Sequence, residues 1–358
     1  MSAEQQNEDL VEDLLAGKHR ALARVITKIE NRATGYRDLV SRLHQHTGHA
    51  EVIGITGSPG AGKSTLVDKM ANYYREQGET VGVIAVDPSS PFTGGAVLGD
   101  RIRMASNVGD MDVFFRSMSA RGTLGGLSTA TTDAVKALDA FGKDKIIIET
   151  VGAGQNEIDI VKSADTVAVL VPPGSGDDVQ MLKAGILEIG DVFVVNKADL
   201  KGADRTVQEL REMIHMQADN TANLATGHHG AGAVESDDEG GDEDVEGGDE
   251  DDEDWEPTIV ETVAKDGEGV ERLVETLAEH RGYLEASGLL EEKVRMRYAE
   301  EIRNLLRDDV GGLLEGELER HGGMDELVER VGRRETDPYS VADEILEPIE
   351  DCLDELRE

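Results

Sequence analysis

A glycine-rich stretch near residue 60 constrains the fold of this chain more than any other feature. A short β-branched run, residues 52–56, leads into the pattern G-x-x-x-x-G-K-[ST], and an apolar-periodic helix follows. In this setting the glycines let the backbone wrap a phosphate, successive N–H groups form an anion nest, and the helix adds its positive amino end. The loop consists of Gly57, Ser58, Pro59, Gly60, Ala61, Gly62, Lys63, Ser64 and Thr65. We expect it to bind a nucleoside triphosphate, with the Lys63 ammonium at the β- and γ-phosphates and the Ser64 hydroxyl at Mg²⁺.

The charge of the chain bounds its partners. The formal net charge is −39, and residues 235–256 hold 15 acidic and no basic side chains. Such a chain repels the phosphates of nucleic acid, so we expect no nucleic-acid partner. An acidic surface with 23 Arg and only 13 Lys suits a high-salt cytoplasm, and a halophilic origin is therefore a hypothesis.

Cellular location is also constrained by composition. No run of about 18 apolar residues occurs, so we expect no membrane span. The acidic amino terminus lacks a signal-peptide pattern, and the single cysteine, Cys352, cannot form an internal disulfide. These features favour a cytoplasmic protein.

Apolar runs alternate with helical patterns through the middle of the chain, which indicates an α/β fold. We expect a P-loop NTPase fold, a mostly parallel sheet flanked by helices, with helical N- and C-terminal extensions. The expected boundaries are 1–48 for an N-terminal helical extension, 49–283 for the nucleotide-binding domain and 284–358 for a C-terminal helical dimerisation arm. Residues 219–256 are expected to form an acidic, disordered insert, because they contain too few apolar side chains to order themselves.

Acidic residues follow two of the predicted strands. Asp87 ends the run 80–86, Asp100 lies in the glycine-bearing loop beyond it, and Glu149 ends an apolar strand that begins at 145. At the carboxyl edge of a parallel sheet such carboxylates can meet Mg²⁺ directly or through water. The N–H of Gly152 can meet the γ-phosphate, and Gln155 is a candidate for orienting water. The alternatives are a turn or cap role for Asp87, a solvated loop charge for Asp100 and a surface acid for Glu149.

A second nucleotide element follows the apolar strand 192–195. Asn196, Lys197 and Asp199 form N-K-x-D, in which the carboxylate can accept hydrogen bonds from the guanine N1–H and 2-amino group. Adenine offers neither donor, so its binding would leave the carboxylate unsatisfied. Val263 and Ala264 follow a later strand, where a small-residue loop would lie against guanine. The pattern therefore predicts GTP rather than ATP.

Together these elements resemble the ArgK/MeaB-type GTPases, relatives of the methylmalonic aciduria type A protein. The motifs that carry the resemblance are residues 57–65, 87–90 with 99–101, 149–155 and 196–199, and it extends over about 10–218 and 257–340. The resemblance implies a homodimer that guards adenosylcobalamin-dependent methylmalonyl-CoA mutase. GTP binding and hydrolysis there gate cofactor delivery and protection, so cobalamin is involved only through the partner.

The resemblance also implies roles for individual residues. Lys63, Asp87 and Asp100 match catalytic positions, and Ser64, Asp87, Asp100 and Glu149 match metal-linked ones. Asp177, Gln180 and Lys183 match a loop that couples the nucleotide to the partner. This sequence departs from the family in its acidic insert and in Thr262-Val263-Ala264-Lys265, where Ser-Ala would be expected.

The reaction expected is GTP hydrolysis by in-line attack of water, with positioning and charge stabilisation supplying the catalysis. Because no activating arginine can be placed, slow intrinsic turnover is expected. Three alternatives stay open: a nickel-inserting metallochaperone GTPase, an adaptor that binds GTP without hydrolysing it, and an ATP-dependent kinase linked to amino-acid transport. The first would need a Cys/His cluster, and N-K-x-D argues against the last.

Overall fold

A computed structural model describes residues 3–87, 110–119, 129–150, 163–174, 188–226 and 254–355. Several residues predicted to act in the site lie outside these ranges: Asp100, Gly152, Gln155, Asp177, Gln180 and Lys183. The chain divides into two compact units, Met1–Lys293 and Val294–Glu358, which are treated separately below.

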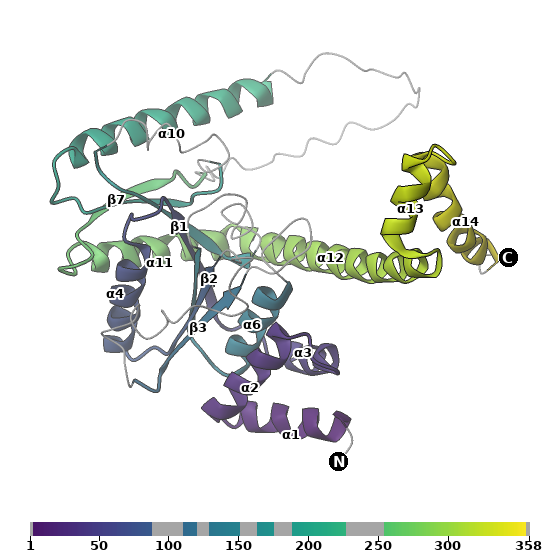
Figure 1. The fold of residues 1–358 in the computed structure, drawn as a ribbon. Coiled ribbons are helices and arrows are strands. Elements are labelled where there is room, and N and C mark those ends of the chain that lie inside the picture. Colours follow the sequence, from purple (N-terminus) through teal and green to yellow (C-terminus); the bar gives the residue numbers. More distant parts are fainter. Residues whose placement is uncertain are drawn as a thin grey trace, which may run out of the picture. The chain divides into compact units, whose positions relative to one another are not determined.

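The first unit is built on a parallel sheet (Figure 1), and within the described ranges this sheet has seven strands. Their order across the sheet is β3-β2-β4-β1-β5-β6-β7, and every neighbouring pair runs parallel. The strands are β1 (Glu51–Gly57), β2 (Val81–Asp87), β3 (Val113–Ser119), β4 (Lys145–Thr150), β5 (Thr166–Val171), β6 (Val192–Asn196) and β7 (Thr258–Thr262). Such a sheet needs both faces covered, which explains the near-continuous apolar runs in its central strands.

Helices cover both faces of the sheet. Side chains of β4 alternate, so that Ile146 and Ile148 join one apolar core while Ile147 joins the other. The first core contains residues of α1 (Ala3–Leu15), α2 (His19–Glu30), α3 (Tyr36–His44), α6 (Thr129–Ala140) and α10 (Ala203–Thr226). The second contains residues of α4 (Lys63–Glu76) and α11 (Val270–Ala286). The expected α/β architecture, with a helical extension at the amino terminus, is confirmed.

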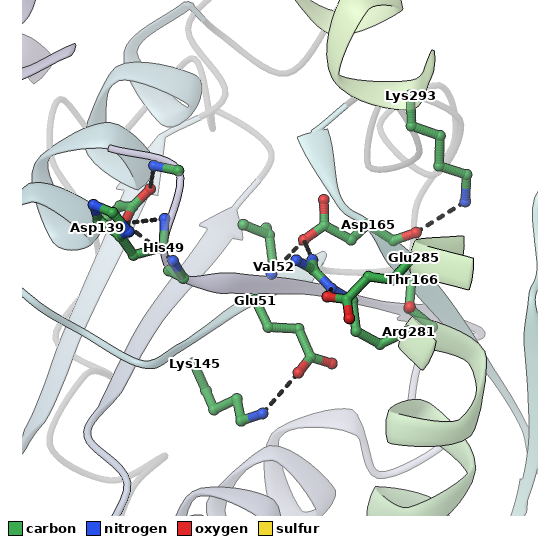
Figure 2. A network of polar contacts seen from close by, with 12 residues as sticks. His49, Glu51, Val52, Asp139, Lys145, Asp165, Thr166, Arg281, Glu285 and Lys293 are labelled. Carbon is green, nitrogen blue, oxygen red and sulfur yellow. Dashed lines mark hydrogen bonds and ion pairs between the residues drawn. The ribbon is translucent and has the colours of Figure 1, made fainter. Parts of the chain in front are cut away.

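A network of hydrogen bonds and ion pairs connects the amino ends of the strands (Figure 2). Asp165, just before β5, accepts hydrogen bonds from the Val52 amide at 3.0 Å and the Arg281 guanidinium at 2.7 Å. The Lys293 ammonium donates to the Asp165 carbonyl oxygen at 2.9 Å. These bonds join β1, β5 and α11 to the start of α12 (Leu289–Arg320), at the sheet edge opposite the glycine-rich loop.

Asp191 contacts a small aromatic cluster at this edge. Its carboxylate accepts a hydrogen bond from the Val167 amide at 2.7 Å, and its backbone carbonyl accepts one from the Trp255 indole at 2.9 Å. The Trp255 ring packs edge-on against buried His280, whose Nδ1 lies 2.8 Å from the Thr166 hydroxyl. Burial and then the neighbouring Lys293 ammonium lower the pKa of His280 to about 4.

The described chain on either side of the acidic segment is more ordered than the sequence predicts. Helix α10 continues to Thr226, within the range 219–256 expected to form the insert. On the return side, Trp255 packs beside His280 although it falls within the expected insert. Local composition does not reveal either feature, because neither a polar helix nor the packing of a single indole ring requires a run of apolar residues.

The second unit consists of helices. Residues of α12 (Leu289–Arg320) continue into it, and α13 (Gly323–Gly332) and α14 (Pro338–Glu355) complete it. Leu327, Val341 and Ile345 form its small core. Gly322, with φ of 92°, lies between α12 and α13, and Gly323, with φ of 80°, begins α13; glycine tolerates this left-handed backbone. The helical C-terminal extension is confirmed. Across the described residues, no helix combines the length and apolarity needed to span a membrane.

Candidate nucleotide-binding site

The sequence motifs meet at the carboxyl edge of the sheet. Strands β1, β4, β6 and β7 run parallel and deliver there, respectively, the glycine-rich loop, Glu149, Asn196 and the Val263–Lys265 segment. Asp87 ends β2, whose Val86 lies opposite Thr150 of β4, so its backbone reaches the same edge. Ligands of open α/β sheets bind at this edge.

Glycine is required at two points of the loop. Gly57 has φ of 131°, and a Cβ there would lie 2.1 Å from the Leu170 carbonyl oxygen. Gly62 has φ of 97°, and a Cβ there would lie 2.4 Å from the Asn196 side-chain nitrogen. Both distances are impossible for a real side chain. The loop backbone therefore lies directly against β5 and against the start of N-K-x-D.

Lys63 is the first residue of α4 and is buried. Its ammonium donates to the carbonyl oxygens of Gly57 at 2.6 Å and Ser58 at 3.0 Å. The loop thus holds a positive charge beside the amino end of a helix, where backbone N–H groups also favour an anion. This arrangement fits a phosphate.

Ser64 and Glu149 form a pair of hard oxygen ligands. The Ser64 hydroxyl donates to a Glu149 carboxylate oxygen at 2.5 Å, and Glu149 is buried at the end of β4. Next to it, the Thr150 hydroxyl donates to that of Thr56 at 2.8 Å, tying β4 to β1. A hydroxyl and a carboxylate at a phosphate-binding loop match the oxygen ligands Mg²⁺ takes, so these residues fit that ion. Of Asp87 only the backbone is described.

Asn196 links the glycine-rich loop to the segment after β7. Its buried amide nitrogen donates to the Ala61 carbonyl at 2.7 Å. Its oxygen accepts from the Ala264 amide at 3.0 Å and the Thr262 hydroxyl at 3.1 Å. One side chain therefore fixes the spacing between the phosphate-binding loop and the predicted guanine-side loop.

Lys197 strengthens the same link. It has φ of 62°, a left-handed backbone that few residues other than glycine adopt. Its ammonium donates a hydrogen bond to the Gly60 carbonyl at 2.7 Å. The amide of the following residue, Ala198, donates to the Thr262 carbonyl at 3.0 Å. The strained conformation is held by contacts on both sides, as is common at ligand sites.

Asp199 is paired with Lys265. The ammonium lies 2.7 Å from a carboxylate oxygen, and this hydrogen bond lowers the pKa of the Asp199 carboxyl. The Lys265 backbone belongs to a tight turn, in which the Val263 amide donates to Glu268 at 3.0 Å and the Asp266 amide to Val263 at 2.9 Å. Val263 and Ala264 are buried in this turn.

Sequence reasoning gave no role to two residues in these contacts, Thr262 and Lys265. Both lie in the segment noted as a departure from the family, and the Thr262 hydroxyl is the signal that could have identified a partner for Asn196.

Among the residues with described positions, no group of three or more His, Cys, Asp or Glu side chains could hold a metal ion.

Comparisons with known proteins agree with this geometry. Residues 22–317 match the family model of the methylmalonyl-CoA mutase-associated GTPase MeaB. A protein of Pyrococcus abyssi that carries a GTPase name is 46% identical over 96% of both chains. GTPase ArgK of Escherichia coli is 30% identical over 83% of this chain and 82% of its own.

Two further matches concern the mammalian relative and the fold. The mitochondrial methylmalonic aciduria type A homolog of Mus musculus is 32% identical over 83% of this chain and 68% of its own. The crystal structure of a LAO/AO transport system kinase matches with a TM-score of 0.62 over 98% of this chain and 99% of its own; at 21% identity it supports the fold alone. The chain is a GTPase and belongs to the MeaB family of methylmalonyl-CoA mutase-associated GTPases.

Proposed function

We propose that this GTPase is a chaperone that gates cobalamin loading of methylmalonyl-CoA mutase and protects the mutase. The family model names the mutase, and a relative over most of the chain is named for methylmalonic aciduria. The observation that carries the nucleotide part of the proposal is the Asn196 bridge, because its hydrogen bonds link the glycine-rich loop to the segment proposed to contact the base.

Guanine is the base that suits this edge. An ionised Asp199 can only accept hydrogen bonds, and guanine offers two adjacent donors, N1–H and the 2-amino group. Adenine presents an acceptor at N1, which would face the carboxylate. GTP is thus the proposed substrate, bound by the loop 57–65 together with Asn196, Lys197, Asp199, Val263 and Ala264.

The proposed hydrolysis depends on positioning and charge. Lys63, now held on two loop carbonyls, would turn to the β- and γ-phosphates of the bound nucleotide and balance the charge that develops there. Ser64 and Glu149 would hold Mg²⁺, which supplies further charge stabilisation when bound. Asp87 and Asp100 are proposed to complete the metal-linked acids.

Homodimerisation is part of the proposal, and α12 supports it. Large apolar side chains on this helix are between 53% and 69% exposed, namely Met296, Ile302, Leu306, Val310 and Leu313. The last four recur at spacings of four, four and three, which places them on one helical face. A second copy of the chain would cover this stripe on both molecules at once, because a two-fold interface uses the same patch twice.

The chaperone function is tested by recovery of the mutase. Full-length protein, immobilised in high salt and loaded with a non-hydrolysable GTP analogue, GDP or no nucleotide, is mixed with purified mutase from the same cells. We expect retention of the mutase that depends on the nucleotide state. No recovery in any state would contradict the chaperone role and leave the GTPase activity standing.

A further inference from the structure

The Lys265–Asp199 ion pair lies at the point where the base would be read. The Lys265 side chain is 63% exposed and that of Asp199 is 36% exposed, with 2.7 Å between the ammonium and the nearer carboxylate oxygen. The two residues come from different loops, one after β7 and one after β6. Their contact therefore links the two loops that are predicted to read the base.

Hydrogen bonds hold the backbone on both sides of this ion pair. The residue before Lys265 donates its amide to Asn196 at 3.0 Å, and the turn after Lys265 is closed by the Gly267 amide on Val263 at 3.1 Å. On the other side, Ala198 donates to Thr262 at 3.0 Å. Lys265 thus reaches Asp199 from a turn that is itself anchored on N-K-x-D.

Reading guanine demands more of a carboxylate than negative charge. Both oxygens must face the base edge in one plane, so that one accepts from N1–H and the other from the 2-amino group. An exposed aspartate on a short side chain can rotate about its Cβ–Cγ bond, since that torsion is broad. A donor fixed on one oxygen restricts this rotation, and each oxygen can still accept a second hydrogen bond.

We propose that Lys265 is a specificity-determining residue that holds the Asp199 carboxylate in register for two-point recognition of guanine. The proposal rests on the role proposed above for Asp199. It assigns Lys265 an effect on the 2-amino contact in particular, because a single hydrogen bond tolerates a rotated carboxylate and a pair of bonds does not. Lys265 acts through Asp199 and is a positioning residue.

Two other roles for Lys265 predict different results. If its ammonium competed with guanine for Asp199, removing the charge would tighten GTP binding. If its methylene chain only packed on the base, removing the charge while keeping the length would leave the affinities for GTP and inosine triphosphate nearly unchanged, or change both equally, since the two bases have similar faces. Hypoxanthine, the base of inosine, differs from guanine by the missing 2-amino group alone.

The test is calorimetric binding of GTP, inosine triphosphate and ATP, with Mg²⁺, to full-length wild type and variants. For Lys265→Met we expect GTP to bind about fivefold more weakly and inosine triphosphate less than about twofold more weakly, the size expected for an exposed ion pair. Lys265→Arg should restore the wild-type ratio. The matched control is Lys201→Met, which removes an exposed lysine two residues from Asp199. Equal losses for the two nucleotides, or tighter GTP binding, would overturn the proposal.

A further variant separates this inference from the proposed function. Asp199→Ala should abolish the preference for GTP over ATP. If it does so while Lys265→Met leaves the ratio of GTP to inosine affinities unchanged, only the role of Lys265 fails. If Asp199→Ala keeps the GTP preference, the proposed base-reading site fails, and the role of Lys265 with it. Raising the salt toward 1 M should shrink the difference between wild type and Lys265→Met, because salt screens exposed charges.

Discussion

Replacing Asn196 with alanine should damage both stability and nucleotide binding. The substitution removes the three hydrogen bonds by which this side chain joins the glycine-rich loop to the segment after β7. The groups left behind are the Ala61 carbonyl, the Ala264 amide and the Thr262 hydroxyl, all on buried residues. The two loops would then lose the side chain that sets their spacing.

The magnitude follows from these three orphaned groups. A buried donor or acceptor that loses its partner costs about 1–3 kcal/mol. Water entering the space vacated by the side chain would satisfy part of this demand, so the total should be about 3–5 kcal/mol, below the simple maximum. GTP affinity should fall at least about a hundredfold, since phosphate and base contacts would no longer be made together.

Urea denaturation followed by circular dichroism measures the first quantity, and calorimetric titration with GTP measures the second. Thr262→Val is the matched control, because it removes only one of the three hydrogen bonds and keeps the side-chain shape. Its expected cost is about 1 kcal/mol. A loss of less than about 1 kcal/mol for Asn196→Ala, or normal GTP affinity in that variant, would refute the reasoning.

Three other predictions concern separate features. In the folded protein His280 has a pKa of about 4 and stays neutral as the pH falls from about 7.5 to about 5.5. In the unfolded chain its pKa is 6.5, so the side chain gains a proton over this range. The free energy of unfolding should therefore fall by about 1.4 kcal/mol. Urea titrations at both values check this, and an equal fall in His280→Gln would count against it. Gly57→Ala should lower the free energy of unfolding, measured with urea, by more than about 4 kcal/mol. Gly60→Ala has open space at the new Cβ and should lower it by about 1 kcal/mol. Similar losses for the two variants would contradict the steric argument. Ser64→Ala should lower Mg²⁺-dependent GTPase activity at least about tenfold, and unchanged Mg²⁺ dependence would exclude the hydroxyl as a ligand.

Local patterns predicted the sheet and the loops that meet at its carboxyl edge, because the evidence for them is local. Residues 57–65 and 196–199 each end a short apolar strand, and parallel strands necessarily bring such ends to one edge. The Asp199–Lys265 pair could not be found in this way. It joins residues 66 positions apart, and nothing in either segment specifies the other until both strands are in place.

Errors at element boundaries have similar causes. Apolar Met111 lies two residues before the start of β3 at Val113, yet it belongs to an exposed turn and does not extend the strand. That turn is held by Asp110 and Asp112, both paired with Arg75. Apolar spacing in α12 predicted a helix correctly, yet within this helix no residue is buried, so the sequence could not show what covers its apolar face.

The most direct test of the base-reading site is a change of nucleotide preference at Asp199. Wild type should bind GTP at least about a hundredfold more tightly than ATP, because adenine leaves the carboxylate unsatisfied. Asp199→Asn presents one donor and one acceptor, which matches the N1–H and 2-oxo groups of xanthine. Titration of both proteins with GTP, ATP and xanthosine triphosphate should therefore show preference moving from GTP to xanthosine triphosphate. Equal affinity of wild type for GTP and ATP, or an unchanged GTP preference in Asp199→Asn, would contradict the account.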